Sequence, residues 1–321
     1  MLRKFVAVLL VAATAFGVSA GARAEEFLRI GSGLAGTYPV FGAKLAEVIN
    51  KNIPGVRAST LAGPTEQTLI RIDKGDAEMG LAYTYQTNQL RNGEGGLGVK
   101  TENLRHVMSL YGAYFMVVVQ DKSDIKSLAD LKTKPYKVWL GTKASTFYAL
   151  NVAALASYGV TPEDTTKAGG VLNTAGYQNL SQAFQDGQVD VAFFSGPAPY
   201  GPMLELDRAP GFRVLSFDKA AGDKFMELLP GVTMRTLKGG LYKSMPSDVN
   251  TPYLINQLVA SSKMSDDLVY KITKLINEHL GEFQGLFAGA NEISTKGALD
   301  GNKIPLHPGA EKYYREVGLI K

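Results

Sequence analysis

The sequence contains no cysteine, and this absence excludes several functions at once. The protein has no disulfide framework, no thiol nucleophile and no cysteine that a lipid anchor could modify. Histidine is almost as scarce: only His106, His279 and His307 occur, and no two of them have a spacing typical of zinc ligands. The G-x-S-x-G nucleophile motif is also missing. These absences argue against an enzyme, and we expect neither a metal nor a cofactor.

Beyond the first residues, the sequence also lacks a long apolar run. The one extended run, Phe5 to Ala20, follows a basic start and precedes the small-x-small sequence Ala22-Arg23-Ala24. This pattern predicts a secretory signal peptide that is cleaved after Ala24. The alternative is an uncleaved N-terminal anchor. We therefore expect residues 25–321 to be exported to the periplasm without direct membrane insertion.

A strong net charge is missing as well. The full chain has 34 basic and 30 acidic residues, a formal net charge of +4. Cleavage after Ala24 removes Arg3, Lys4 and Arg23 and no acidic residue, so the remaining net charge is +1. A nearly neutral protein offers no electrostatic basis for binding nucleic acid or anionic lipid. Because 45% of the residues are apolar, we expect a globular protein with one large or two ordinary domains.

What the sequence does contain is an alternation of strand-like and helix-like segments, which favours a mostly parallel α/β fold. Strands are predicted for residues 27–30 and for the stretches AEMGLAYT, YFMVVVQ, KVWLG and VDVAFFSG. Helices are predicted for residues 39–50 and 65–74 and for the stretches TFYALNVAALASYG and NLSQAFQDG. From Val249 onward the pattern predicts helices throughout.

The order of glycines indicates two similar halves. In the first half, a strand leads to Gly31, a polar loop and a helix, and a later helix ends at Gly75 just before another strand. Gly141 and Gly187 repeat this order in the second half; coincidence among glycines is the alternative. Each half would end its first strand at a helix N-terminus, whose free N–H groups attract carboxylates and phosphates. Two such ends across a cleft would hold a small anion.

The stretch from Gly31 to Gly36, GSGLAG, matches the G-x-G-x-x-G pattern of dinucleotide-binding turns. That interpretation requires an acidic residue about 20 positions further on. Residues 53–60, IPGVRAST, contain none, so we expect the glycines to expose N–H groups to a smaller anion. Glu78 and Asp190 resemble a carboxylate pair, but each follows a helix end, and we interpret them as stabilising turns.

Hydroxyl and aromatic side chains follow the predicted strands, at the position where α/β proteins bind ligands. The candidates are Thr37, Tyr38, Tyr83 and Tyr85 in the first half and Thr142, Lys143, Ser145, Thr146, Phe194 and Ser195 in the second. The aromatic residues are equally compatible with ordinary core packing. Lys143 is the one formal charge in these loops, suited either to a ligand carboxylate or to solvent.

Seven stretches together carry a family resemblance that runs along essentially the whole chain after the signal peptide. They are IGSGLAGTYPVFGAKLAEVINKN, PGVRASTLAGPTEQTL, KGDAEMGLAYT, DIKSLADLK, DGQVDVAFFSGPAP, LVYKITKLINEH and IPLHPGAEKYYRE. In this order they resemble the TAXI-type solute receptors of tripartite ATP-independent periplasmic (TRAP) transporters. The resemblance implies a two-lobe periplasmic binding protein fold of the second type, with a hinge and an interlobe ligand cleft. We place lobe I at residues 25–112 and 241–321 and lobe II at 113–240.

The resemblance also implies a binding site. The family's first glycine loop falls on Ser32, Gly33, Gly36, Thr37 and Tyr38, its next loop on Gly63, and the position after the second strand on Tyr83. The second-lobe loop, usually G-x-x-G-S-G-T in the family, reads Gly141-Thr142-Lys143-Ala144-Ser145-Thr146 here. Lys143-Ala144 thus replaces two glycines, which exchanges backbone N–H groups for a lysine charge.

These inferences predict a periplasmic solute-binding receptor and not an enzyme. The resemblance implies a small anionic solute of the glutamate/glutamine, dicarboxylate or 2-oxoacid type, delivered to the permease subunits of an ion-gradient-driven TRAP transporter. Three alternatives stay open: a periplasmic ligand sensor, an ABC-type receptor of the same fold, and an exported serine hydrolase. The hydrolase would use Ser145 or Ser195, for which the sequence offers no evident base.

Overall fold

The structure is a computed structural model that describes residues 25–34, 36–143, 145–208 and 211–321. The predicted signal peptide, residues 1–24, lies outside the described residues. Within those described ranges, no helix has both the length and the apolar character that a membrane crossing requires.

Strands and helices alternate from the start of the described chain. The first part contains β1 (Glu26–Gly31), α1 (Tyr38–Asn52), β2 (Val56–Leu61), α2 (Thr65–Lys74), β3 (Met79–Tyr83), α3 (Thr84–Asn92) and the long β4 (Leu104–Gln120). The second contains η1 (Leu128–Lys132), β5 (Lys137–Trp139), α4 (Thr146–Ser157), α5 (Pro162–Lys167), β6 (Val171–Asn173), η2 (Tyr177–Asn179), α6 (Leu180–Gln185), β7 (Val191–Gly196), α7 (Gly201–Leu206), β8 (Phe212–Leu215), α8 (Lys219–Leu228) and β9 (Thr233–Leu237). The last part contains β10 (Val249–Ser261), α9 (Asp266–Glu278), α10 (Leu280–Phe283), η3 (Ala288–Glu292) and α11 (Pro308–Glu316).

The two lobes share one strand order. In lobe I the parallel strands β2, β1 and β3 are followed by the antiparallel β10 and then by β4. In lobe II the parallel strands β6, β5 and β7 are followed by the antiparallel β4 and then by β8. The internal repeat predicted from the glycines is therefore confirmed, with left-handed Gly75 and Gly187 at the ends of equivalent helices. The predicted α/β fold is confirmed with it.

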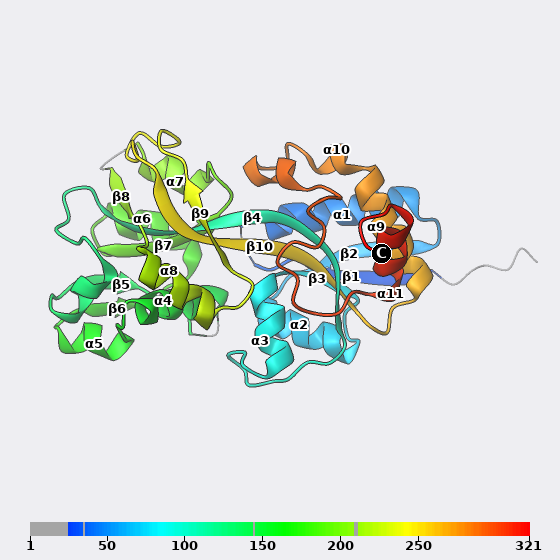
Figure 1. Cartoon of the computed structure of the whole chain (residues 1–321), viewed down its shortest axis with the longest axis horizontal. Helices are drawn as coiled ribbons and strands as arrows, with labels where there is room; N and C mark the ends of the chain where they lie inside the picture. Colours follow the sequence, from blue (N-terminus) through cyan, green and yellow to red (C-terminus); the bar gives the residue numbers. More distant parts are fainter. Residues whose placement is uncertain (1–24, 35, 144, 209–210) are drawn as a thin grey trace, which may run out of the picture.

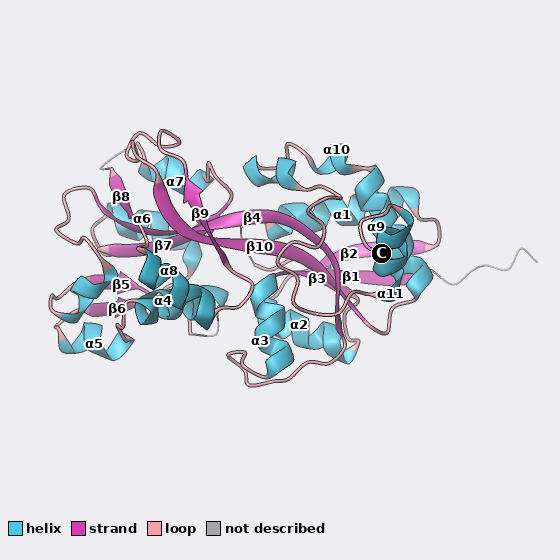
Figure 2. Ribbon diagram, viewed as in Figure 1, coloured by secondary structure: helices cyan, strands magenta, loops and turns pink. Residues whose placement is uncertain are grey.

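β4 and β10 join the lobes and run side by side through the middle of the molecule (Figure 1). The first half of β4 pairs with β10, whereas its second half pairs with β7 and β8. The hydrophobic core changes at the same place: Tyr111 and Leu258 belong to the cluster of lobe I, whereas Ala113 and Leu254 belong to that of lobe II. The chain therefore crosses between the cores near residues 112 and 255. The second crossing comes later than the expected start of lobe I at residue 241, because Tyr242, Met245 and Val249 also pack in the cluster of lobe II. Figure 2 shows helices on both sides of each half of the sheet.

The prediction of helices throughout from Val249 onward is wrong for residues 249–261, which form β10. Almost every residue of this strand is buried, because it lies inside the sheet with a partner on each side. A strand that is covered on both faces shows no alternation of apolar and polar residues, so periodicity does not distinguish it from a buried helix. The helical pattern does hold from Asp266, where α9 begins after the N-cap Ser265.

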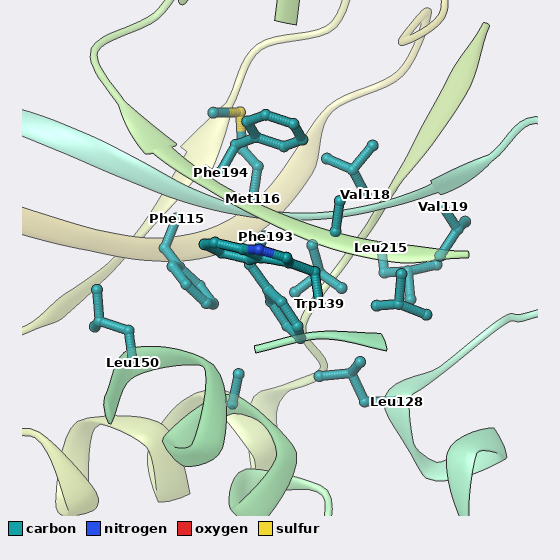
Figure 3. Packing of buried hydrophobic residues seen from close by; sticks show 14 of the residues in the cluster. Phe115, Met116, Val118, Val119, Leu128, Trp139, Leu150, Phe193, Phe194 and Leu215 are labelled. Atoms are coloured by element: carbon teal, nitrogen blue, oxygen red, sulfur yellow. The ribbon is translucent and has the colours of Figure 1, made fainter. Parts of the chain in front are cut away.

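A dense apolar core holds the sheet of lobe II against its helices. Figure 3 shows Phe115, Phe193 and Trp139 between the strands and the helix that carries Leu150. The rings of Phe115 and Phe193 stack with centroids 5.8 Å apart. Burying each such side chain contributes about 1.5–3 kcal/mol. This packing fixes the ends of β5 and β7, which lead to the cleft.

Glu78 and Asp190 play the same structural role in the two lobes. Glu78 accepts a hydrogen bond from the backbone N–H of Arg29 at 2.6 Å and pairs with its guanidinium at 2.7 Å. Asp190 accepts one from the backbone N–H of Lys137 at 2.7 Å. Each acid thereby ties the entry of β3 or β7 to the first strand of its own lobe, which accounts for both carboxylates structurally.

Candidate functional site

A cavity of about 300 Å³ lies between the lobes, where β1, β3, β5 and β7 end. Loops from both lobes form its wall. Of the residues singled out in the sequence, the wall contains Gly33, Gly36, Thr37, Tyr38, Gly63, Tyr83, Thr142, Ser145 and Ser195. Residues from distant parts of the chain thus meet around one space, as the repeated topology requires.

Four other candidates lie outside the cavity wall. Ser32 is buried against α1: a Cβ added to Gly42 of this helix would lie 2.8 Å from the Cβ of Ser32. Phe194 is buried in the core of lobe II, and Tyr85 and Lys143 line an adjacent groove. Thr146 begins α4, but its side chain lies outside the described residues, as does Ala144.

Two helices begin at this cavity without a side-chain cap. The N-cap of α1 is Thr37, whose hydroxyl is bonded instead to the hydroxyl of Tyr111 at 2.6 Å. The N-cap of α2 is Pro64, which has no capping group. Gly33 and Gly36 have φ values of 65° and 76°, which bring the chain into α1 in a turn that other residues adopt with strain. The N–H groups of a first helical turn have no partner within the helix, and together with the partial positive charge of both helix ends they suit an anion, although Pro39 offers no N–H group in α1.

Tyrosine hydroxyls supply neutral hydrogen-bonding groups. The hydroxyl of Tyr38 is buried and has no hydrogen-bond partner among the described residues, and burial raises its pKa well above the ordinary value. The Tyr83 hydroxyl lies 3.2 Å from the Ser195 hydroxyl of the other lobe, and burial raises the pKa of Tyr83 to about 12. Both tyrosines are therefore protonated at pH 7, so that they can donate a hydrogen bond to a carboxylate without repelling it.

None of the cavity-lining side chains in the described part of the chain carries a formal charge. Asn256 of β10 also lines the cavity. Its Nδ2 donates to the carbonyl of Tyr111 at 2.9 Å, while its buried Oδ1 has no partner within the described ranges. Phe147 and Tyr177 stack with centroids 4.3 Å apart and form an aromatic wall. The cavity can therefore bind a solute with an anionic group, a flat or apolar body and a hydrogen-bond donor.

The sequence analysis did not single out Asn256, Phe147 or Tyr177. Phe147 follows the predicted strand KVWLG and meets the same criterion as Tyr83, so the pattern could have identified it. Tyr177 follows β6, for which the sequence analysis predicts no strand, and it had no such signal. Asn256 had no such signal, because its segment was predicted to be helical.

The serines of the hydrolase alternative are engaged in other contacts. Ser145 caps α4 by accepting from the backbone N–H of Tyr148 at 3.2 Å, and Ser195 is bonded to Tyr83. The histidines are occupied elsewhere in the described chain: His106 lies between Gln257 and the carbonyl of Ala298, His279 is bonded to Glu282, and His307 caps α11. This arrangement offers neither serine a histidine base.

The family model described as the NMT1-like family matches residues 31–318. The chain belongs to the NMT1-like family. The solved structures similar to this chain include the periplasmic aliphatic sulphonate binding protein SsuA from Escherichia coli. Its sequence identity to this chain is 17%, the match covers 90% of this chain and 78% of that chain, and the TM-score is 0.43. XAC2383 from Xanthomonas citri bound to ATP has 14% identity, coverage of 92% and 97%, and a TM-score of 0.48. The substrate binding protein of an amino acid ABC transporter has 14% identity, coverage of 81% and 96%, and a TM-score of 0.47.

Proposed function

We propose that this NMT1-like protein is an exported, non-enzymatic receptor that captures a small carboxylate-bearing solute between its lobes. The solute class is glutamate/glutamine, dicarboxylate or 2-oxoacid. The observation that carries the proposal is the pair of uncapped helix ends, α1 and α2, beside a buried Tyr38 hydroxyl without a partner. An unpaired buried hydroxyl costs about 1–3 kcal/mol, so a ligand that bonds to it regains that energy.

In this proposal, the carboxylate accepts hydrogen bonds from the first N–H groups of α1 and α2 and from Tyr38. The body of the solute lies between Tyr83 and the Phe147–Tyr177 stack. The hydroxyls of Thr142 and Ser145 approach from lobe II. Bending of β4 and β10 closes the lobes and excludes water, which strengthens each of these contacts.

The partner proposed here is a membrane permease of the TRAP type, to which the receptor delivers its solute. This part rests on the resemblance to TAXI-type receptors. The test is uptake by vesicles that contain the neighbouring permease and the purified receptor. We expect uptake to follow an imposed ion gradient without ATP; uptake that requires ATP would assign the receptor to an ABC transporter instead.

A thermal-shift screen against amino acids, dicarboxylates and 2-oxoacids tests the ligand class. A solute at 100 times its Kd stabilises the folded protein by about 2.7 kcal/mol, which raises the melting temperature. For a solute that binds, Tyr38→Phe removes one hydrogen bond to a charged group and should raise the Kd about tenfold or more. The matched control is Tyr136→Phe, at a hydroxyl that binds Asp124 away from the cavity. No stabilisation by any carboxylate, or an unchanged Kd in Tyr38→Phe, would refute the proposal.

A further inference from the structure

A second hollow, which we call the side groove, adjoins the cavity. It has a volume of about 260 Å³ and shares Gln86 and Ser145 with the cavity wall. Glu66 and Tyr85 line it from lobe I and Lys143 from lobe II. The two spaces are therefore neighbours that meet at Gln86 and Ser145.

Charge distinguishes the two spaces. Among the described residues, the cavity wall has no charged side chain, whereas the side groove has one anion and one cation on opposite lobes. Glu66 is held in place because its Oε1 accepts a hydrogen bond from the backbone N–H of Leu97 at 2.8 Å. Neither Glu66 nor Lys143 forms an ion pair within the described part of the chain. The two charges are thus available to a ligand that carries both signs.

A buried hydroxyl provides a second, independent indication of a ligand. Tyr85 is only 1% exposed, lines the side groove, and its hydroxyl has no hydrogen-bond partner in the part of the chain that the structure describes. Its ring stacks on Tyr83 at 5.9 Å with an angle of 18° between the planes. Tyr85 is therefore fixed beside the wall of the cavity, with a polar atom that water does not reach. Such a group is costly unless something bonds to it.

We propose that the side groove is a second subsite that binds the zwitterionic α-amino-carboxylate head of the solute. This proposal rests on the proposed function, because the distal carboxylate of the same solute occupies the cavity. The head carboxylate pairs with Lys143, the ammonium group pairs with Glu66, and the Tyr85 hydroxyl bonds to the head between them. The ligand class is then an extended amino acid with an acidic side chain.

Three probes with the same distal carboxylate test this assignment. L-2-aminoadipate carries the full head, adipate lacks the ammonium group, and 5-aminopentanoate lacks the head carboxylate. The Kd of each probe is measured by calorimetry on the full chain and on three variants. Glu66→Gln keeps an oxygen for the Leu97 N–H, Lys143→Ala removes the cation, and Lys167→Ala is the control at an exposed lysine of the same lobe.

The proposal predicts a crossed pattern. L-2-aminoadipate binds more tightly than either analogue. Lys143→Ala weakens L-2-aminoadipate and adipate by about fivefold, the size of a solvent-exposed ion pair, and leaves 5-aminopentanoate unchanged. Glu66→Gln weakens L-2-aminoadipate and 5-aminopentanoate by a similar factor and does not weaken adipate. Lys167→Ala changes none of the three.

Each other pattern overturns the assignment. Equal changes for all three probes would mean that Lys143 and Glu66 pair with each other when the lobes close. Unchanged affinities would mean that nothing bound reaches the side groove. If adipate binds as tightly as L-2-aminoadipate, the subsite is refuted while the proposed function stands. If none of the probes binds although the variants keep the wild-type melting temperature, this ligand class and the subsite fall together.

Discussion

Replacing Gly112 by alanine tests the structure at the point where the chain crosses between the lobes. Gly112 lies in β4 beneath the ring of Tyr253, and an added Cβ would be 1.7 Å from the ring's Cζ and Oη atoms. The ring has little room to move. Arg235 stacks on it 3.8 Å from its centroid, Tyr114 meets it edge-on at 4.9 Å, and its hydroxyl donates to Glu292.

The expected cost follows from these contacts. Overpacking of a buried site costs about 1–3 kcal/mol. Displacing Tyr253 also breaks its hydrogen bond to the carboxylate of Glu292, which is worth about 1.5–3 kcal/mol. We therefore expect Gly112→Ala to lower the free energy of unfolding by about 4 kcal/mol. The melting temperature should fall by about 10 °C in calorimetry.

Two comparisons make this prediction specific. Gly281→Ala in α10 is the control, because no atom of the described residues lies within 4 Å of a Cβ added there. Since alanine favours a helix more than glycine does, this variant should not lower the melting temperature. In a Tyr253→Leu background the side chain is too short to reach the new methyl group, so Gly112→Ala should cost less than about 1 kcal/mol. Wild-type stability of Gly112→Ala, or the same cost in both backgrounds, would refute the explanation.

Three further predictions concern spectroscopy and pH. The ring centroid of Trp139, the only tryptophan, lies 6.0 Å from that of Phe147 and 5.8 Å from that of Tyr177. A solute in the cavity should therefore change the fluorescence of Trp139, and constant emission during binding that calorimetry detects would contradict this. Burial raises the pKa of Tyr83 to about 12, so the neutral Tyr83 contributes fully to the free energy of unfolding below pH 10, and this contribution is lost as the pH rises to about 12. In urea unfolding, Tyr83→Phe should reduce the decrease of the free energy of unfolding over this pH range by about 1.4 kcal/mol per pH unit. Burial lowers the pKa of His106, so the unfolded chain binds the proton first and stability should fall as the pH drops below about 6.5, less steeply in His106→Gln.

The parts of the fold that follow from local rules could be predicted from the sequence. The turn at Gly31 to Gly36 and the helix stop at Gly75 depend on the glycines themselves, because positive φ values favour glycine there. Parallel strands must end on one edge of the sheet, so the loops that follow β1, β3, β5 and β7 were expected to meet. This reasoning placed Thr37, Tyr83 and Ser195 around one cavity without any knowledge of long-range contacts.

What depends on distant pairing could not be predicted. β10 is recognisable as a strand only through its partners β3 and β4, because its own residues are buried on both faces. Lys143 is a comparable case. Its loop neighbours Thr142 and Ser145 line the main cavity, but only the packed lobes show that the side chain of Lys143 lines the side groove instead. The sequence reports which loops approach the cleft, whereas side-chain direction is decided by the three-dimensional packing.

The place where β4 and β10 cross between the lobes lies at the cavity wall, so solute binding and the proposed lobe closure involve the same residues. The pairing of β4 with β10 shifts register between Ile255 and Gln257, which forms a bulge that includes Tyr111 of β4. The side-chain Nδ2 of Asn256 donates a hydrogen bond to the carbonyl of Tyr111. The hydroxyl of Tyr111 is bonded to Thr37 at the start of α1. Asn256 and Thr37 both line the cavity, so in the closure proposed above, bending of the strands at this bulge moves two walls of the cavity together. In that proposal a solute that bonds to both residues restrains the strands directly at Asn256 and, at Thr37, through Tyr111.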